Sequence, residues 1–404
     1  MSITIEPLVV PLDRRVSLAV HGLEPHRVYT VHLRARRQHG PGTEQALTAD
    51  DRGCLALEAD FSQRGEQWLD VLDGGERLAR LSCYVAPPKL HARRPLRCDF
   101  HIHTLYSDGK SSPAEMAVRG RELGLDVAVI TDHNAYPASL EAMAEVARLG
   151  LNVVTGPGEE VSGPNWHLLS VGADAAIYAL GQESGAFLNE AEWKYEAMHW
   201  AIRAIQAHGG RAYLAHPYWS VERGFHLPSP WYDRVLEEGL LDGVELLGDV
   251  LHENNFRSLA RYRDFLAAGG RIPILGNSDT HRRGHTYGTY WTLVWAEEPT
   301  LAGVLDAIAD GWSVACTTAG RASSGETRAR QMAAHGSFEL VDYAYWLEER
   351  FFPAHDRLCR EEAALAYKVL AGEALGEGAL EGCRAEMEGL YARGWGRRRA
   401  GFPE

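Results

Sequence analysis

The chain has 404 residues, of which 45% are hydrophobic and 24% charged, a composition typical of globular proteins that bury a large core. This length favours two or three domains. A formal net charge of −14 argues against a general nucleic-acid binder, because phosphate backbones are held by a surplus of Lys and Arg.

The six cysteines are dispersed and form no CxxC pair, which favours reduced thiols and a cytoplasmic location. The N-terminus lacks the basic and apolar regions of a secretory signal. No apolar run approaches the ~20 residues of a membrane span, so we expect no membrane partner. The sequence leaves the oligomeric state open, a homo-oligomer included.

Residues 1–92 predict a β-sandwich-like accessory domain, because short alternating segments are separated by turn residues. Four of its histidines, His21, His26, His32 and His39, lack tight ligand spacing and are expected to be ordinary surface or core residues. A proline-rich linker follows, from Pro87 to Pro95. The expected strands are Ser2–Val10, Arg15–Val20, Tyr29–Arg34, Cys54–Phe61, Gln67–Val71 and Leu78–Val85.

Residues 98–318 alternate between strand and helix patterns, which predicts a parallel sheet or barrel. The first strand is expected at Phe100–His103. Ser112-Pro113-Ala114-Glu115 then predicts a helix start with a capping box. Residues 320–404 show no strand signal and predict a helical C-terminal region. Its expected helices are Phe338–Phe352, Asp356–Leu370 and Glu377–Tyr391.

The sequence His101-x-His103 places two imidazoles on the same face of a strand. With 18 His in 404 residues, roughly one such pair arises by chance, so the pair gains weight only from its neighbours. These neighbours are His, Asp and Glu side chains at the ends of successive expected strands, where sites gather in α/β folds. They are Asp108, His133, Glu160, His167, His216, Asp279 and His281. Such ligands suit Zn, Mn or Fe, so the set predicts a metal site.

In their order along the chain, these motifs resemble the PHP (polymerase and histidinol phosphatase) domain, a family of amidohydrolase-like metal-dependent hydrolases. The resemblance covers residues 98–318. The combination with an N-terminal β-domain is also similar to the CehA/McbA-like, or carbaryl-hydrolase-like, branch. The resemblance implies an α/β fold, a distorted (βα)7 barrel of PHP type, with two or three divalent metal ions. Its motifs include Ser107-Asp108-Gly109, Thr131-Asp132-His133-Asn134, Gly158-x-Glu160, His216-Pro217 and Ser278-Asp279-Thr280-His281.

The resemblance also implies how the ligands divide among three metals. The first metal would be held by His101, His103, Glu160 and Asp279, the second by Glu160, His167 and His216, and the third by Asp108, His133 and His281. Glu160 would bridge two ions. The adjacent Glu159 is an alternative bridge, and the register of His167 is open.

Clustered divalent ions lower the pKa of a bound water to about 7 and neutralise charge on the attacked centre. A metal-bridging hydroxide is therefore the expected nucleophile, with Asp279 or His281 shuttling the proton as catalytic residues. A cationic pocket in an acidic protein favours a small anionic substrate, first of all a phosphate ester. Arg282, Arg283 and His285 follow the last motif and are candidates for binding its anionic group.

The expected function is a metal-dependent hydrolase, with a phosphoesterase favoured. An amide, carbamate or carboxyl-ester hydrolase is the alternative, and an apolar pocket around Tyr218 and Trp219 would favour it. A metal-dependent partner-binding module is the second alternative, although docking does not need a complete ligand set. Two further carboxylates are candidates for the site: Asp132, to orient a ligand histidine, and Glu245, at a strand end.

Overall fold

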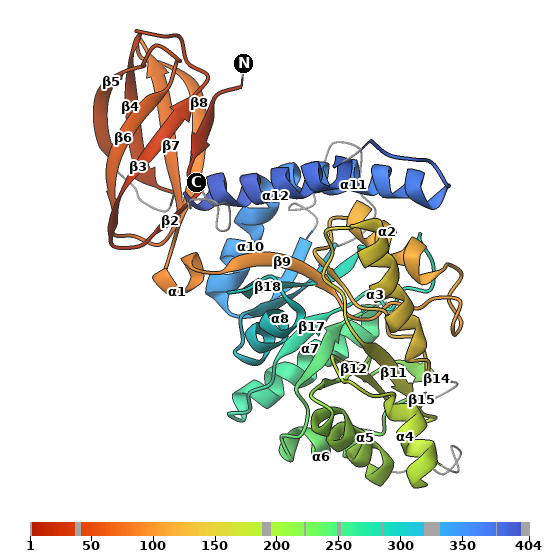
Figure 1. Cartoon of the computed structure of the whole chain (residues 1–404). Helices are drawn as coiled ribbons and strands as arrows, with labels where there is room; N and C mark the ends of the chain where they lie inside the picture. Colours follow the sequence, from red (N-terminus) through yellow and green to blue (C-terminus); the bar gives the residue numbers. More distant parts are fainter. Residues whose placement is uncertain are drawn as a thin grey trace. The chain divides into compact units, whose positions relative to one another are not determined.

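The computed structural model of the chain describes residues 2–36, 42–187, 195–221, 224–248, 252–284, 286–318, 332–376 and 378–396 (Figure 1). These residues form two compact units. The first, here called the β unit, comprises Met1–Arg94, Asp342–His355 and Arg384–Glu404. The second, the α/β unit, comprises Pro95–Val341 and Asp356–Cys383. Among the described residues, no helix has the length and apolar character that a membrane crossing requires.

The β unit contains two sheets, drawn in red to orange in Figure 1. Their strand orders are β1-β3-β6 and β2-β8-β7-β4-β5. Every second residue of β6 is buried, and Leu57 shares one apolar core with Val31 and Val71 of the other sheet. The bounds are β1 Thr4–Glu6, β2 Val9–Pro11, β3 Arg14–His21, β4 Val28–Ala35, β5 Thr43–Thr48, β6 Leu55–Phe61, β7 Gly65–Asp73 and β8 Glu76–Ala86.

Two details of the β unit differ from the sequence prediction. The expected strand Ser2–Val10 is two strands, since β1 ends before Pro7, which has no N–H to continue a ladder. Strand β5 was not expected, because it leaves no residue buried and so carries no clear apolar alternation. The expected linker contains a short helix, α1, Pro88–His91.

Segments from the C-terminal region complete the β unit. Tyr343 of α10 (Phe338–Arg350) stacks on Tyr84 with 4.4 Å between ring centroids. Trp346 of the same helix donates from Nε1 to Ser82 Oγ at 2.8 Å. In α12 (Ala379–Trp395), the Gly394 carbonyl accepts from the Leu8 N–H at 2.8 Å. These contacts tie residues distant in sequence into one unit.

The α/β unit contains two mixed five-stranded sheets, β10-β9-β18-β19-β20 and β11-β12-β13-β16-β17. Leu96 and Val294 of the first sheet share a core cluster with Leu169 and Leu275 of the second. The bounds in the first sheet are β9 Arg94–Asp99, β10 Val127–Ala128, β18 Tyr290–Ala296, β19 Ser313–Thr318 and β20 Met332–His335. Those in the second are β11 Gly158–Ser162, β12 His167–Val171, β13 Arg211–Leu214, β16 Gly243–Leu247 and β17 Ile274–Gly276.

Single parallel bridges join the ends of the two sheets. Ile102, beyond β9, pairs with Thr280, beyond β17. His133, beyond β10, pairs with Glu160 of β11. These two bridges bring the segments that carry the predicted ligands side by side.

The sequence prediction of parallel strands is wrong at β12, which runs antiparallel to both β11 and β13. Only residues 163–166 separate β11 from β12, too few for a parallel crossover. The expectation of no strand beyond residue 320 is also wrong, because β20 pairs antiparallel with β19. This four-residue segment is too short to give a periodic signal.

Helices pack against the strands of the α/β unit. The helix predicted after Ser112 is confirmed: α2 spans Pro113–Glu122, and Ser112 and Glu115 form the capping box. Ile177, Ile202 and Val235, from α4, α5 and α6, share a core with strands β12, β13 and β16. The remaining bounds are α3 Pro137–Leu149, α4 Ile177–Ser184, α5 Tyr195–Ala207, α6 Ser229–Glu237, α7 His252–Ala267, α8 Leu301–Ala309 and α11 Phe352–Leu370.

Candidate metal centre

His101 and His103 lie directly beyond β9, rather than within a strand at Phe100–His103 as the sequence predicted. Both side chains are fully buried, and their ring centroids are 5.0 Å apart. The bridge of Ile102 to Thr280 keeps this segment extended, with Ile102 turned into the core. The two imidazoles therefore share a face, as the alternation of an extended chain requires.

Glu160 lies at the centre of the cluster, and both its carboxylate oxygens contact imidazole nitrogens. Oε1 is 3.3 Å from His101 Nε2, 2.9 Å from His167 Nδ1 and 3.1 Å from His216 Nε2. Oε2 is 3.5 Å from His103 Nε2 and 2.7 Å from His133 Nδ1. One carboxylate thus contacts five histidines.

Glu159, the other candidate for the bridge, points elsewhere. Its Oε1 accepts hydrogen bonds from the backbone N–H groups of Ile177 and Tyr178, at the start of α4. Successive residues of β11 face opposite sides, so only one of two adjacent glutamates can face the histidines. The structure places Glu160 there and uses Glu159 to cap a helix.

Asp279 approaches the histidines from beyond β17. Its Oδ1 lies 3.0 Å from His103 Nε2 and 3.2 Å from His101 Nε2. Donor atoms around a tetrahedral ion with bonds of ~2.0–2.2 Å are about 3.3–3.5 Å apart, close to these separations. The spacing of Glu160, Asp279 and the two histidines therefore fits one small divalent ion.

Asp108, His133 and His281 form a more exposed group. Asp108 Oδ2 lies 3.1 Å from His281 Nε2 and 3.8 Å from His133 Nε2. The rings of His103 and His281 stack at 4.2 Å, which links this group to the buried one. The structure thus brings all nine predicted ligand residues together.

Glu245 contacts two of the predicted ligand residues, His101 and His216. Its Oε1 is 2.8 Å from His101 Nδ1, and its Oε2 accepts from the His216 backbone N–H at 2.8 Å. The contact with His101 holds a proton on Nδ1. Nε2, which faces Glu160 and Asp279, would therefore be the nitrogen that binds an ion. The side chain of Asn277 donates to the same Oε1 at 2.8 Å.

The prediction that Asp132 orients a ligand histidine is wrong. Asp132 accepts from the backbone N–H and hydroxyl of Thr104, at 2.7 and 2.6 Å, and from Ser107 Oγ at 2.5 Å. Both partners lie in the loop between His103 and Asp108. Asp132 therefore shapes the loop that carries Asp108 and does not contact an imidazole.

The charges of the cluster depend on one another. Burial works to lower the pKa of His133, but the carboxylates of Glu160 and Asp108 outweigh it and raise that pKa to about 9. Burial favours the neutral form of Glu160, yet His101, His167 and His133 hold its pKa well below the usual range. Without a metal ion, protons on imidazoles balance the carboxylates. A bound cation would replace those protons.

Several buried atoms of the cluster have no hydrogen-bond partner among the described residues. They include His101 Nε2 and His103 Nδ1. A buried polar atom without a partner costs roughly 1–3 kcal/mol, and more when charged. A divalent ion would satisfy such lone pairs, so the donor set fits the metals that the sequence predicted.

Backbone strain also concentrates at this site. His216 and Asp279 adopt positive φ angles of 24° and 49°, and Asn134 has a φ of 51°. Such conformations are uncommon for residues other than glycine and cluster where side chains must be aimed. The Asn134 side chain holds the neighbouring backbone by pairing with both the N–H and the carbonyl of Ser162.

Arg282 and Arg283, the predicted substrate-binding residues, are exposed beyond Asp279 and His281. Arg283 Nη1 is 3.5 Å from Glu115 Oε1, and its carbonyl accepts from Arg119 Nε at 2.8 Å. His285, the third candidate, lies outside the described residues.

Sequence reasoning missed His226 as a member of the cluster. His226 is buried, and its ring centroid lies 4.4 Å from that of His167. Burial and the nearby His167 and His216 lower the pKa of His226 to about 3. Its position ten residues after His216 fits no short motif, because the hairpin of β14 (Ser220–Val221) and β15 (Gly224–Phe225) brings it back.

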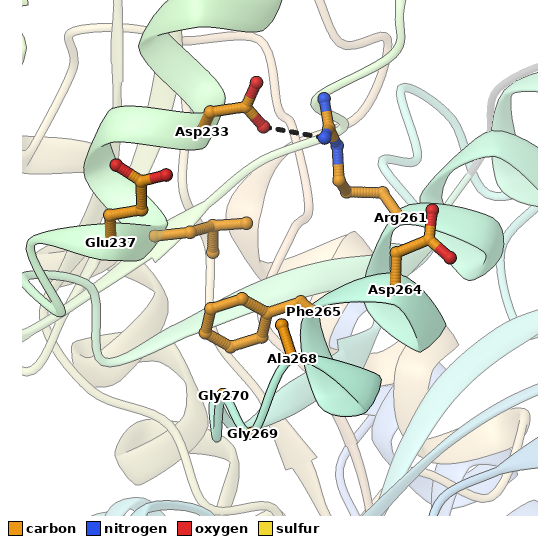
Figure 2. Close-up of a pocket in the computed structure, with 9 residues that line it drawn as sticks. Asp233, Glu237, Arg261, Asp264, Phe265, Ala268, Gly269 and Gly270 are labelled. Carbon is orange, nitrogen blue, oxygen red and sulfur yellow. Dashed lines mark ion pairs between the residues drawn. The ribbon is translucent and has the colours of Figure 1, made fainter.

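A separate pocket of about 570 Å3 lies between α6 and α7. Figure 2 shows the ion pair of Asp233 and Arg261 across it, at 2.7 Å. Phe265 and Leu236 supply its apolar lining. No residue of the histidine cluster lines this pocket, so it is distinct from the candidate centre.

Residues 99–182 match the PHP domain family. Over these residues the chain resembles a PHP domain. The match includes His101, His103, Asp108, His133, Glu160 and His167, six of the nine clustered ligand residues. The resemblance inferred from the ordered motifs is therefore confirmed.

Two curated relatives align with parts of the chain. An uncharacterized protein of Methanocaldococcus jannaschii, MJ1587, is 27% identical over 162 residues, 37% of this chain and 81% of that protein. The 5'-3' exoribonuclease Rnm of Escherichia coli is 38% identical over 64 residues, 16% of this chain and 22% of the exoribonuclease. The chain thus spans only about a fifth of Rnm.

Among solved structures, the chain is similar to a two-domain protein from Bacteroides vulgatus that contains a predicted PHP-like metal-dependent phosphoesterase. The identity is 20%, the TM-score 0.41, and the match covers 55% of this chain and 65% of that one, just under two thirds. An amidohydrolase from Chromobacterium violaceum with bound sulfate is 18% identical, with a TM-score of 0.36 and coverage of 47% and 89%. Both TM-scores are low.

Proposed function

We propose that the chain is a metal-dependent hydrolase, most of all a phosphoesterase that acts on a small phosphate ester. The observation that carries this proposal is the carboxylate of Glu160, which lies within 3.5 Å of nitrogens on five buried or half-buried histidines. Such a concentration of neutral donors around one carboxylate is typical of a polynuclear metal centre.

The proposed centre holds two or three divalent ions of Zn, Mn or Fe. Glu160 would bridge the first ion, held with His101, His103 and Asp279, and the second, held with His167 and His216. Asp108, His133 and His281 would hold the third. This division is supported by the distances within each group, 2.9–3.5 Å around Glu160 and 3.1 Å between Asp108 and His281.

When bound, the ions would supply a bridging hydroxide at neutral pH and positive charge opposite the attacked centre. The chain's own residues would do the rest. Asp279 and His281 lie at the exposed edge of the cluster and would hold and transfer the proton. Glu245 would keep His101 in the tautomer that leaves Nε2 free of hydrogen.

Arg282 and Arg283 would bind the anionic group of the substrate. Their position directly after His281, together with their exposure, supports this role. Arg283 Nη1 lies 3.5 Å from Glu115 Oε1. This ion pair is long, so a phosphate could compete with Glu115 for the guanidinium.

An amide, carbamate or carboxyl-ester hydrolase is the second candidate. The exposed indole of Trp219 favours it, since this side chain is 40% exposed and packs against His216 and His167 at 5.4 and 5.7 Å. A planar apolar group of a substrate could stack there. A partner-binding module is supported less, because docking gives no reason for buried unpaired ligand atoms.

We also propose a fold for the hydrolase and a division of the chain into three segments. The catalytic fold would be a distorted (βα)7 barrel of PHP type, supported by the bridges between the ends of the two sheets. The segments 1–92, 98–318 and 320–404 would be a β-sandwich-like accessory domain, the hydrolase barrel and a helical C-terminal region.

The test begins with metal-free protein reloaded with Zn, Mn or Fe and supplied with phosphoester, amide and carbamate substrates. His101→Ala, Glu160→Ala and His216→Ala are each expected to abolish metal-stimulated turnover while circular dichroism stays native. His208→Ala is the matched control, because His208 is an exposed histidine paired with Asp174 outside the cluster. Unchanged turnover in all three site variants would exclude the metal mechanism. Turnover of amides alone would favour the second candidate.

A further inference from the structure

His226 is a third buried histidine on the side of the cluster where His167 and His216 lie. It is 6% exposed, and its ring centroid is 4.4 Å from His167 and 6.3 Å from His216. Nitrogen atoms of His167, His216 and His226 all lie within 4.8 Å of one another. His226 lies outside the nine residues that the metal motifs assign.

The hydrogen bonds of His226 define which nitrogen carries a lone pair. Nε2 lies 3.0 Å from the Gly163 carbonyl, which can only accept, so Nε2 carries the proton. Nδ1 is then the nitrogen with the lone pair. A metal-ligating histidine almost always donates its other ring N–H to a carbonyl or carboxylate in this way.

The surrounding chain keeps this ring beside the cluster. The backbone N–H of His226 donates to the Trp219 carbonyl at 2.7 Å, which closes the hairpin of β14 and β15. The Trp219 indole lies 5.1 Å from the His226 ring and also contacts His216 and His167. The hairpin therefore delivers an imidazole and a covering indole to the same side of the cluster.

From this geometry we propose that His226 is a further protein ligand of the ion held by Glu160, His167 and His216. The inference rests on the proposed metal centre. A spacing of up to 4.8 Å exceeds that around a tetrahedral ion by roughly 1–1.5 Å, which rotation of the His226 side chain can close.

A fourth protein ligand gives this ion a role different from the others. Metal sites closed by four protein ligands hold their ion firmly, whereas catalytic sites keep an open position. The ion beside His226 would therefore be the most tightly held of the centre. The open coordination positions for water and substrate would lie at the other ions, toward Asp279 and His281.

The experiment titrates metal-free full-length protein with cobalt(II), following visible absorption and calorimetry. His226→Phe keeps an aromatic ring against Trp219 and His167 but removes both nitrogens. His226→Gln keeps an N–H that can donate to the Gly163 carbonyl. His208→Gln is the control. We expect both His226 variants to weaken one class of cobalt site at least tenfold and to change its spectrum, with the other classes and the control within twofold.

Three other outcomes would contradict the role of His226, its assignment to one ion, or the metal centre itself. If both variants keep every class of site within twofold and lose only thermal stability, His226 merely anchors the hairpin and the proposal falls. If all classes weaken together, His226 supports the centre as a whole and the assignment to one ion is wrong. If the wild-type protein binds no cobalt, the proposed function is wrong as well. If the wild-type protein binds cobalt and the variants do not differ from it, only the role of His226 is wrong.

Discussion

The two units of the molecule differ in the partners of their charged side chains. In the β unit, Asp70 and Arg80 form a two-pronged pair at 2.7 and 2.8 Å, and the Arg80 guanidinium lies 4.5 Å from the Trp68 ring. Each of these two charges has a partner of opposite sign. In the α/β unit, Glu160 and Asp279 face imidazoles, some of whose buried nitrogens have no hydrogen-bond partner among the described residues.

If the proposed function holds, this difference separates charges that serve folding from charges that serve a ligand. Paired charges on a sheet surface stabilise weakly and need nothing from outside the chain. A buried cluster of ligand atoms destabilises the chain until a cation satisfies it. The same α/β unit shows that burial alone is not the cause. Arg121 is fully buried, yet it contacts Glu362 at 2.8 Å and Asp126 at 3.1 Å.

Removal of metal should produce the largest contrast between the units. A ligand present at a thousand times its dissociation constant stabilises a fold by about 4 kcal/mol, so a chelator should lower the unfolding temperature of the α/β unit by several degrees. The unfolding of the β unit should not change. Calorimetry with and without chelator measures this. Equal shifts in both units, or none, would remove the contrast.

Replacing Glu245 with glutamine should have an intermediate effect. The change keeps the shape but weakens the hold on His101 Nδ1 and on the His216 backbone. Loss of such an outer partner typically lowers metal affinity 10–100-fold. Competition with a coloured chelator measures the affinity. Glu362→Gln, a buried carboxylate away from the cluster, is the matched control and should reduce stability without changing metal affinity.

The smallest effect is expected from Asp70→Asn in the β unit. The hydrogen bonds from Arg80 hold the pKa of Asp70 below its usual value. The ionised carboxylate therefore contributes stability above the unfolded pKa of ~3.9, and this is lost as pH falls through the folded pKa. After solvent screening the contribution is about 1 kcal/mol or less. Urea unfolding at pH 7, 5 and 3, with chelator present, should show the two proteins converging in acid. A difference in the free energy of unfolding that stays constant with pH would show that the ionised Asp70 carboxylate is not its cause.

Much of the site could be predicted because ligand chemistry is local in sequence. His101-x-His103 places two ligands at alternate positions of an extended segment, whereas Asp279-x-His281 follows the end of another expected strand. Strand ends bring the two pairs together. The choice between Glu159 and Glu160 could not be made, since both are carboxylates and only packing decides which face of β11 turns inward. His226 was missed because its approach depends on a hairpin with no spacing signature.

The fold was predictable where periodicity was strong and failed where the chain was short or long-range contacts decided. The capping box at Ser112 is a local signal, and α2 begins there. The direction of β12 depends on the length of a four-residue connection rather than on its own composition. The place of Tyr343 and Trp346 against β8 depends on a contact across more than 250 residues, which no local pattern contains.

The adjacent carboxylates of β11 have a consequence for anyone who aligns or engineers this chain. A shift of one position in an alignment exchanges Glu159 and Glu160, two residues with the same chemistry and opposite orientations. One deletion in this strand would likewise turn the helix cap toward the histidines and the bridging side chain toward α4. A comparison of the Glu159→Gln and Glu160→Gln variants would therefore show which of the two glutamates corresponds to the ligand position of a relative. The first should loosen α4, and the second should empty the centre.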